Sequence, residues 1–303
     1  MNGAPLIPVL KGATAADWVE NRYSATPDAE FERQVREIVQ QVRARGDAAA
    51  LEYTEVLDGV RLAGLQVDMK RCGAALEALP AARRRALEQA RINVERVHAA
   101  QRRSEPEVSV EPGVRTWREF RPIGRVGIYA PGGLATYPSS VLMAVVPARL
   151  AGCEQIAVCS PPTSSGEPAE AIMAAAALLG VDELYSVGGA QAIAAMAFGT
   201  ETIARVDKIF GPGGRWVNAA KLSVFSEVEI DLAAGPSEVA VWTDDSSRLD
   251  WVAAELLAQA EHGKDSMSVA VLRSDEQAAQ VSGLLSAQLA MLERQQIIRQ
   301  SLS

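Results

Sequence analysis

The chain has 303 residues, of which 48% are hydrophobic and 22% are charged, and its formal net charge is −8. This length suggests about two domains, and the composition excludes disorder over most of the chain. The acidic balance excludes nucleic-acid binding as the main task, because no excess of basic side chains is present to displace counterions. No apolar run is long enough to span a membrane, and three cysteines are too few for a disulfide framework. Since the N-terminus also lacks a signal-peptide pattern, we expect a cytoplasmic protein.

The first part of the chain predicts an irregular arm followed by helices. Residues 1–26 look irregular and include two prolines. Apolar residues recur at a helical period over 28–45, and helical patterns continue over 48–57 and 81–101. Residues 107–123 predict a β-hairpin, because a Glu-Pro-Gly turn separates two runs of alternating type.

From residue 125 onward, short apolar runs alternate with alanine-rich helical runs. The pattern predicts strands at 126–130, 155–159, 183–187, 207–210 and 228–231, separated by helices at 139–151, 167–179, 190–198 and 215–225. This alternation is typical of βαβ units around a mainly parallel sheet. Because the crossovers are right-handed, the carboxyl ends of the strands share one edge, where such sheets bind ligands.

The last part of the chain predicts a further, shorter alternation. We expect strands at 238–242 and 267–272 and a helix at 276–292. Between the strands, Asp245 or Ser246 can cap a helix that runs to about His262 and that Gly263 closes.

Three glycine loops lie between predicted strands and helices: Pro131–Gly133, Gly188–Gly189 and Gly211–Gly214. Glycine lets a ligand approach the backbone, and a following helix N-terminus offers unpaired N–H groups. Each loop alone is more typical of a tight turn, and none matches a dinucleotide fingerprint or a P-loop. Together on one sheet edge, they would form a platform for an anion or a nucleotide.

The two histidines differ in context. His98 is expected on a helix surface, whereas His262 lies three residues after Gln259, so both side chains leave one helix face. An imidazole and an amide oxygen can both bind a metal, but zinc needs at least three protein groups. The alternative is a histidine that the helix dipole favours at a C-terminus. Ser237 likewise is either a structural turn residue or a residue that points into the same ligand-binding cleft. The three cysteines are expected to be buried and inert.

Six segments together resemble the histidinol dehydrogenase family. They include the runs VGIYAPGG, GAQAIAAMAFGTE, DKIFGPGG, DLAAGPSEV and LAQAEHG, and they span residues 125–134, 138–154, 185–202, 206–215, 230–240 and 256–264. The resemblance implies two Rossmann-like parallel-sheet domains with a helical N-terminal block, in an aldehyde-dehydrogenase-like architecture. It implies an N-terminal arm over 1–26, an inserted NAD-binding domain over 129–238 and a discontinuous α/β domain made of 27–128 and 239–303.

The resemblance also implies an activity and the residues that serve it. The family oxidises L-histidinol to L-histidine through an aldehyde in two NAD-dependent steps, with zinc, as a homodimer. Carried over to this sequence, Gln259 and His262 bind zinc and substrate, and Ser237 contacts substrate. Tyr129 and Gln191 contact NAD, and the family's third NAD contact, an asparagine, is replaced here by Gly214.

The family continues beyond the position of Ser303, with a Glu-His pair that acts as general acid and base and with two more zinc ligands. No catalytic residue is therefore expected within this chain, which resembles the N-terminal portion of the enzyme. Two alternatives stay open: a truncated, non-catalytic NAD-binding paralogue, and a related dehydrogenase that acts on another alcohol.

Overall fold

The computed structural model describes residues 7–23, 28–102, 105–132, 136–232, 238–263 and 266–302. The chain divides into two compact units. One, here called the sheet unit, is Asp28–Ala233, and the other, the terminal unit, combines Met1–Pro27 with Ala234–Ser303. Each has its own parallel strands covered by helices, so the predicted α/β class is confirmed.

The sheet unit is built on five parallel strands in the order β5-β4-β3-β6-β7. The chain enters at the central strand, moves outward over β4 and β5, and returns to the other side of β3 as β6 and β7. The order therefore reverses between β3 and β6, which is the switch point where doubly wound sheets bind their ligands. The strands are β3 (Arg125–Tyr129), β4 (Gln155–Ser160), β5 (Glu183–Ser186), β6 (Lys208–Phe210) and β7 (Glu229–Ile230).

Helices cover both faces of this sheet and form a hydrophobic core on each. One core contains buried residues of α2 (Ala29–Arg45), α3 (Asp47–Asp58), α8 (Gly189–Phe198) and α9 (Arg215–Val224). The other contains residues of α4 (Met69–Ala78), α6 (Pro138–Leu150) and α7 (Glu170–Leu178). Residues 190–197 of α8 are all buried, as expected for a helix that is apolar on every side apart from Gln191.

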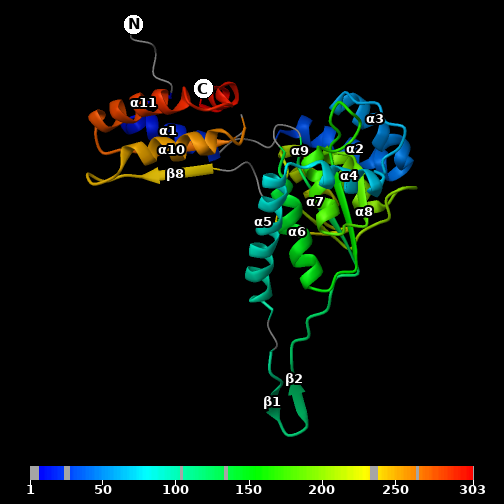
Figure 1. Cartoon of the computed structure of the whole chain (residues 1–303). Helices are drawn as coiled ribbons and strands as arrows, with labels where there is room; N and C mark the ends of the chain where they lie inside the picture. The colour runs from blue at the N-terminus through cyan, green and yellow to red at the C-terminus, as the bar shows by residue number, and fades with distance from the viewer. Residues whose placement is uncertain are drawn as a thin grey trace. The chain divides into compact units, whose positions relative to one another are not determined.

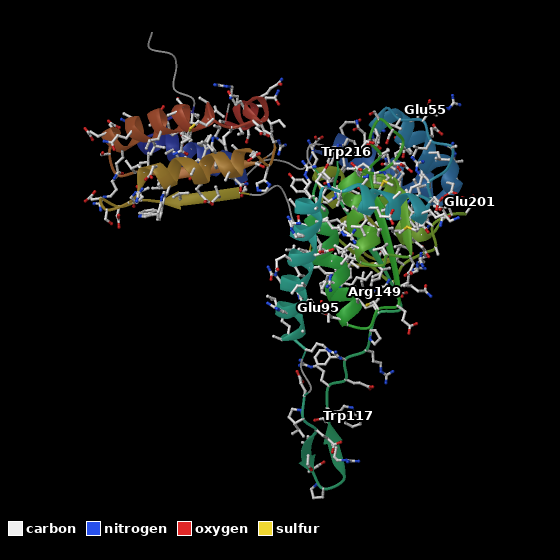
Figure 2. The ribbon with its side chains drawn as sticks, in the orientation of Figure 1. Glu55, Glu95, Trp117, Arg149, Glu201 and Trp216 are labelled. Atoms are coloured by element: carbon white, nitrogen blue, oxygen red, sulfur yellow. The ribbon has the colours of Figure 1, made fainter. Side chains whose placement is uncertain are left out.

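A helix and a hairpin extend from this packed body (Figure 1). Helix α5 (Ala81–Ala99) has no fully buried residue and lies along α6, and the predicted hairpin forms from β1 (Val108–Glu111) and β2 (Val114–Thr116). The side chains of both strands are exposed, and so is Trp117 just beyond them (Figure 2).

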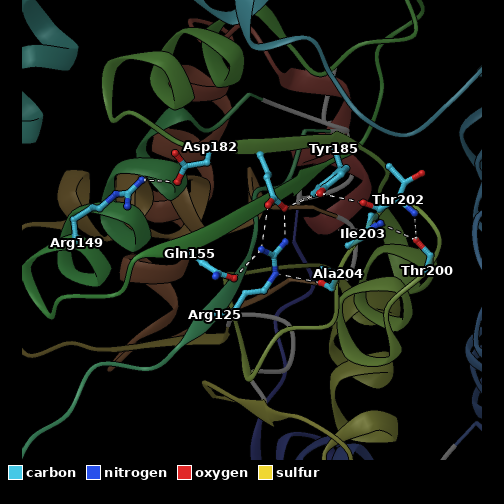
Figure 3. Close-up of polar contacts among 10 residues, drawn as sticks. Arg125, Arg149, Gln155, Asp182, Tyr185, Thr200, Thr202, Ile203 and Ala204 are labelled. Atoms are coloured by element: carbon cyan, nitrogen blue, oxygen red, sulfur yellow. Dashed lines mark hydrogen bonds and ion pairs between the residues drawn. The ribbon is translucent and has the colours of Figure 1, made fainter.

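The amino edge of the sheet, opposite the glycine loops, is fixed by a polar network (Figure 3). Arg125 at the start of β3 donates from both terminal nitrogens to Glu183, and its Nε donates to the carbonyl of Ala204 at 3.4 Å. The Tyr185 hydroxyl donates to Glu183 at 2.7 Å. These bonds, that of Arg125 first, hold the pKa of Glu183 below its usual value.

The terminal unit contains two parallel strands, β8 (Glu238–Trp242) and β9 (Met267–Val271). Its core comes mainly from α10 (Leu249–Ala260), α11 (Asp275–Leu289) and α12 (Gln295–Leu302). The strands and the helix between them match the sequence pattern, although α10 begins later and ends earlier than expected.

Two local expectations were wrong. Residues 1–26 are not wholly irregular, because α1 covers Gly12–Tyr23; its few apolar residues gave no periodic signal. Neither Asp245 nor Ser246 caps α10, whose first turn has no side-chain cap. Instead, Asp244 accepts hydrogen bonds from Ser246 and Ser247 in a turn that precedes the helix.

The predicted domain limits stay a prediction. The structure groups residues 28–128 with the five-stranded sheet, whereas the sequence joined 27–128 to the C-terminal segment. Within the described residues, no helix combines the length and the apolar character needed to cross a membrane.

Candidate functional site

Strands β3 and β6 meet closely at the switch point, and Gly211 makes this possible. Gly211 follows β6 with a φ of +121°, a conformation that side chains rarely adopt. A Cβ added here would collide with the carbonyl of Tyr129 at the end of β3. The loop after β6 is therefore held directly against the end of the central strand.

Tyr129 joins this contact to the next glycine loop. Its side chain is buried, and its hydroxyl accepts the backbone N–H of Gly189 at 3.3 Å. Burial raises the pKa of Tyr129 to about 12, so the phenol is neutral at physiological pH. Tyr129 thus links the end of β3 to the first turn of α8.

Gln191 lies in that first turn and is fully buried. Its Nε2 donates to the Asp58 carboxylate at 3.4 Å, but its Oε1 has no hydrogen-bond partner among the described residues. Asp58 is exposed as a residue, yet its carboxyl group faces Gln191, and burial raises its pKa. A buried amide oxygen without a donor costs about 1–3 kcal/mol, so this atom is available to accept a hydrogen bond from a ligand or a water.

The loops after β3, β4 and β5 converge around Pro161. A Cβ at Gly132 would lie 3.3 Å from the Pro161 ring and from the Ser160 hydroxyl, and a Cβ at Gly188 would collide with the Pro161 side chain. Ser160 is buried, and its hydroxyl also lacks a partner among the described residues. Glycine at both positions thus lets the loops after β3 and β5 pack directly against Pro161, beside the unpartnered Ser160 hydroxyl.

Two of the cavities along the described part of the sheet unit bear on where the site lies. An open one of about 380 Å³ lies beside Asp58 and is lined by Asp58–Arg61, Pro162 and Ser164–Gly166. A larger one, about 720 Å³, lies at the amino edge. Two of its arginines, Arg43 and Arg45, are already paired with glutamates. We therefore place the candidate site at the carboxyl edge, despite the smaller volume there.

Sequence reasoning missed Lys221 and Asp231. Lys221 is 3% exposed, and its Nζ donates to the Gly211 carbonyl at 2.6 Å and to Asp231 Oδ1 at 2.5 Å. Asp231 Oδ2 accepts the Gly211 N–H at 2.8 Å. A signal was present, because a lysine stands within the buried stripe of α9 beside Val217, Ala220 and Val224.

The candidate metal ligands lie in the terminal unit. Gln259 is half-buried in the last turn of α10, and His262 is exposed in the turn that follows. Glu261 between them pairs with Arg294 at 3.7 Å. Among the described residues, no group of three or more His, Cys, Asp or Glu side chains could hold a metal. A glutamine and one histidine do not complete a zinc site, which needs at least three protein ligands.

Other candidates fall where expected or outside the described residues. His98 is half-buried on α5, and its Nδ1 pairs with Gln101 Oε1 at 2.8 Å. All three cysteines are buried, and burial raises the pKa of Cys72 to about 11. Ser237 and Gly133 are not among the described residues.

Comparison with known proteins decides the family. A family model described as histidinol dehydrogenase matches residues 21–303. The chain belongs to the histidinol dehydrogenase family. Histidinol dehydrogenase from Vibrio parahaemolyticus is 44% identical over 290 residues, which are 95% of this chain and 66% of that protein. The enzyme from Geobacillus kaustophilus is 46% identical over 276 residues, 90% of this chain and 64% of that protein.

A solved histidinol dehydrogenase has the same fold. The crystal structure from Elizabethkingia anophelis matches with a TM-score of 0.87 and 36% identity, over 99% of this chain and 70% of that chain. The chain spans about two thirds of the length of the curated histidinol dehydrogenases that it matches. The resemblance seen in the sequence motifs is therefore confirmed, and so is the fold class.

Within this histidinol dehydrogenase fold, the residues expected to contact NAD stand at one sheet edge. Tyr129 and Gln191 both adjoin Gly189, and Gly214 is the N-cap of α9 at the end of the Gly211 loop. A Cβ at Gly214 would meet nothing within 4 Å, and its φ of −69° suits any residue. The position is thus open to the asparagine that the family resemblance implies there.

Proposed function

We propose that this chain provides the NAD-binding part of an enzyme that oxidises L-histidinol to L-histidine through histidinal, the last steps of histidine biosynthesis. The observation that carries the proposal is the buried, unpartnered Oε1 of Gln191 beside Gly188 and Gly189. Membership of the histidinol dehydrogenase family supports the choice of substrate and of NAD.

Each group at the carboxyl edge has a defined task in this proposal. The N-terminal N–H groups of α8 receive the diphosphate, since a helix N-terminus favours anions. Gln191 Oε1 accepts a hydrogen bond from the cofactor, and neutral Tyr129 keeps Gly189 in place without adding charge. NAD, when bound, supplies the hydride acceptor for the oxidation.

The terminal unit carries the proposed substrate contacts, Ser237, Gln259 and His262. The same glutamine and histidine are the proposed zinc ligands, but the described residues do not complete a zinc site. Glu261–His262 is the one adjacent Glu-His pair in the sequence and is already taken by these contacts, so the chain alone is expected not to turn over. We further propose that the protein is cytoplasmic and forms a homodimer. Light scattering would test the dimer.

Calorimetric titration of the whole chain with NAD tests the proposal. We expect saturable binding that Gln191→Leu weakens about fivefold, since a ligand hydrogen bond contributes about 1 kcal/mol. Gln89→Leu is the matched control, because Gln89 is exposed on α5 and donates to Asn93. Failure of the unaltered chain to bind NAD would contradict the proposal.

Measurements of turnover test which alcohol the enzyme oxidises. NADH formation is measured with L-histidinol and a panel of other small amino alcohols, first with the chain and then with a version extended to the length of its relatives. We expect the extended version to oxidise histidinol in preference to the other alcohols. A preference for another alcohol would instead support the related-dehydrogenase alternative.

A further inference from the structure

We propose that Lys221 and Asp231 are positioning residues for the cofactor: together they hold Gly211 and so fix the Gly211–Gly214 loop on which NAD binding depends. We call this pair the Gly211 clamp. Because its role presupposes NAD at the carboxyl edge, the inference rests on the proposed function and deepens it.

The clamp binds both polar backbone atoms of a single glycine. The Gly211 carbonyl accepts from Lys221 Nζ at 2.6 Å, and the Gly211 N–H donates to Asp231 Oδ2 at 2.8 Å. Lys221 and Asp231 also contact each other, because Lys221 Nζ forms an ion pair with Asp231 Oδ1 at 2.5 Å. Gly211 is therefore fixed by two charged groups at a position where the chain has no side chain of its own.

One member of the clamp lies in a helix, and the other directly follows strand β7. Lys221 projects from α9 within a stripe of buried residues, and the backbone N–H of Asp231 donates to the Ile209 carbonyl of β6 at 3.0 Å. The clamp thus ties the helix after the loop to the strands before and beside it. The loop is held at its first residue, Gly211, and its last residue, Gly214, is the N-cap of α9. It therefore has little conformational freedom, and such preorganisation favours ligand binding.

Stability alone is a poor reason for this arrangement. Lys221 is 3% exposed, and burying a charge costs more than an apolar residue of similar size would. Leucine or methionine would satisfy the core between α9 and the sheet. What an apolar residue cannot do is hold the Gly211 carbonyl, next to the end of Tyr129, in one orientation.

The test separates positioning from stability. Lys221→Met leaves Asp231 without its cation and is expected to lower both the melting temperature and the NAD affinity, the latter about tenfold. Adding Asp231→Asn removes the unpaired charge, so the double variant is expected to regain melting temperature but not NAD affinity. If affinity returned together with stability, the pair would be merely structural, and the positioning role would be overturned.

Hydrogen exchange provides a readout that does not need NAD. In the free protein, Lys221→Met is expected to speed exchange in peptides that cover residues 208–216, while peptides of α6 stay unchanged. The milder Asp231→Asn variant gives the same comparison if Lys221→Met fails to fold. Unchanged exchange in whichever variant folds would overturn the clamp.

Lys208→Met is the matched control. Lys208 also pairs with a carboxylate across β6 and β7, at 3.3 Å from Glu229, but it makes no contact with the glycine loop that the structure records. We expect this variant to bind NAD like the unaltered chain. Absence of NAD binding by the unaltered chain would overturn the proposed function, whereas equal binding by the unaltered chain and Lys221→Met would overturn the clamp alone.

Discussion

Gly214 offers a gain-of-function test at the scale of one residue. A Cβ there meets open space, and asparagine at this N-cap can accept a backbone N–H of the first turn of α9. We expect Gly214→Asn to stabilise the protein by a few tenths of a kcal/mol and to tighten NAD binding several-fold, because it supplies the amide that the family resemblance places there. Thermal denaturation and NAD titration measure both effects.

Gly213 is the neighbouring control for that substitution. A Cβ at Gly213 would collide with the Val217 side chain, so Gly213→Asn is expected to lower the melting temperature and to weaken NAD binding. Equal effects of the two substitutions would show that the loop has no defined packing and would contradict the structure of the site.

Residues of the site differ in how well the sequence predicts them. Tyr129, Gln191 and the glycine loops lie in short motifs at strand ends, so their common edge follows from the order of strands and helices. Asp58 approaches Gln191 from a helix far earlier in the chain, and local patterns contain no information on that contact. Lys221 was overlooked because a lysine usually indicates a solvent-facing position, and only its tertiary partners show otherwise.

At the scale of elements, the Arg125 network predicts a pH-dependent stability. Glu183 has a pKa below its ordinary value of 4.5, chiefly because Arg125 donates to it. A lowered carboxyl pKa contributes stability above the ordinary value, and this stability is lost as the pH falls through the folded-state pKa. Glu183→Gln should therefore cost about 1–2 kcal/mol at neutral pH, a value reduced because the Glu183 side chain is 29% exposed.

Urea denaturation at neutral and acidic pH measures this effect. The difference between the unaltered chain and Glu183→Gln is expected to shrink as the pH falls below 4.5. Glu95→Gln is the control, since Glu95 forms an exposed pair with Arg91 within α5 and should cost less than about 0.5 kcal/mol. A difference that stays constant with pH would contradict the assigned charge of Glu183.

Helices and strands with a strong hydrophobic pattern were predictable from the sequence, and those with a weak pattern were not. The strands of the sheet unit have continuous apolar runs, and α8 is apolar apart from Gln191, so their type follows from the sequence. Helix α4 was missed although Cys72 and Ala75 are buried, because small residues give a weak apolar stripe. The start of α10 was misplaced because the Asp244 turn satisfies the polar groups that were expected to cap the helix.

At the scale of the whole molecule, the two units have separate cores. The sheet unit contains two clusters on opposite faces of its sheet, and the terminal unit contains a smaller one around α10 and α11. The sequence predicted two α/β parts but set their limits by family resemblance, because no local pattern shows which sheet a helix joins. The grouping of α2 and α3 with the five-stranded sheet depends on long-range packing.

Because the two units have separate cores, we expect two thermal unfolding transitions. NAD should identify which transition belongs to the sheet unit. The residues proposed to bind NAD all lie in the sheet unit, so NAD is expected to raise only that unit's transition, since a ligand stabilises the state that binds it. Core truncations assign the transitions: Ile193→Ala in α8 and Leu285→Ala in α11 each remove a fully buried side chain and should cost about 3 kcal/mol in their own unit.

Scanning calorimetry of the chain, alone and with NAD, is the measurement. We expect Leu285→Ala to lower one transition and to leave the NAD-dependent shift of the other intact, because Leu285 belongs to the core of the terminal unit. Ile193→Ala should lower the transition that NAD raises. A single transition that both substitutions lower equally would show that the units unfold together, and an NAD shift confined to the Leu285 transition would place the cofactor in the terminal unit instead.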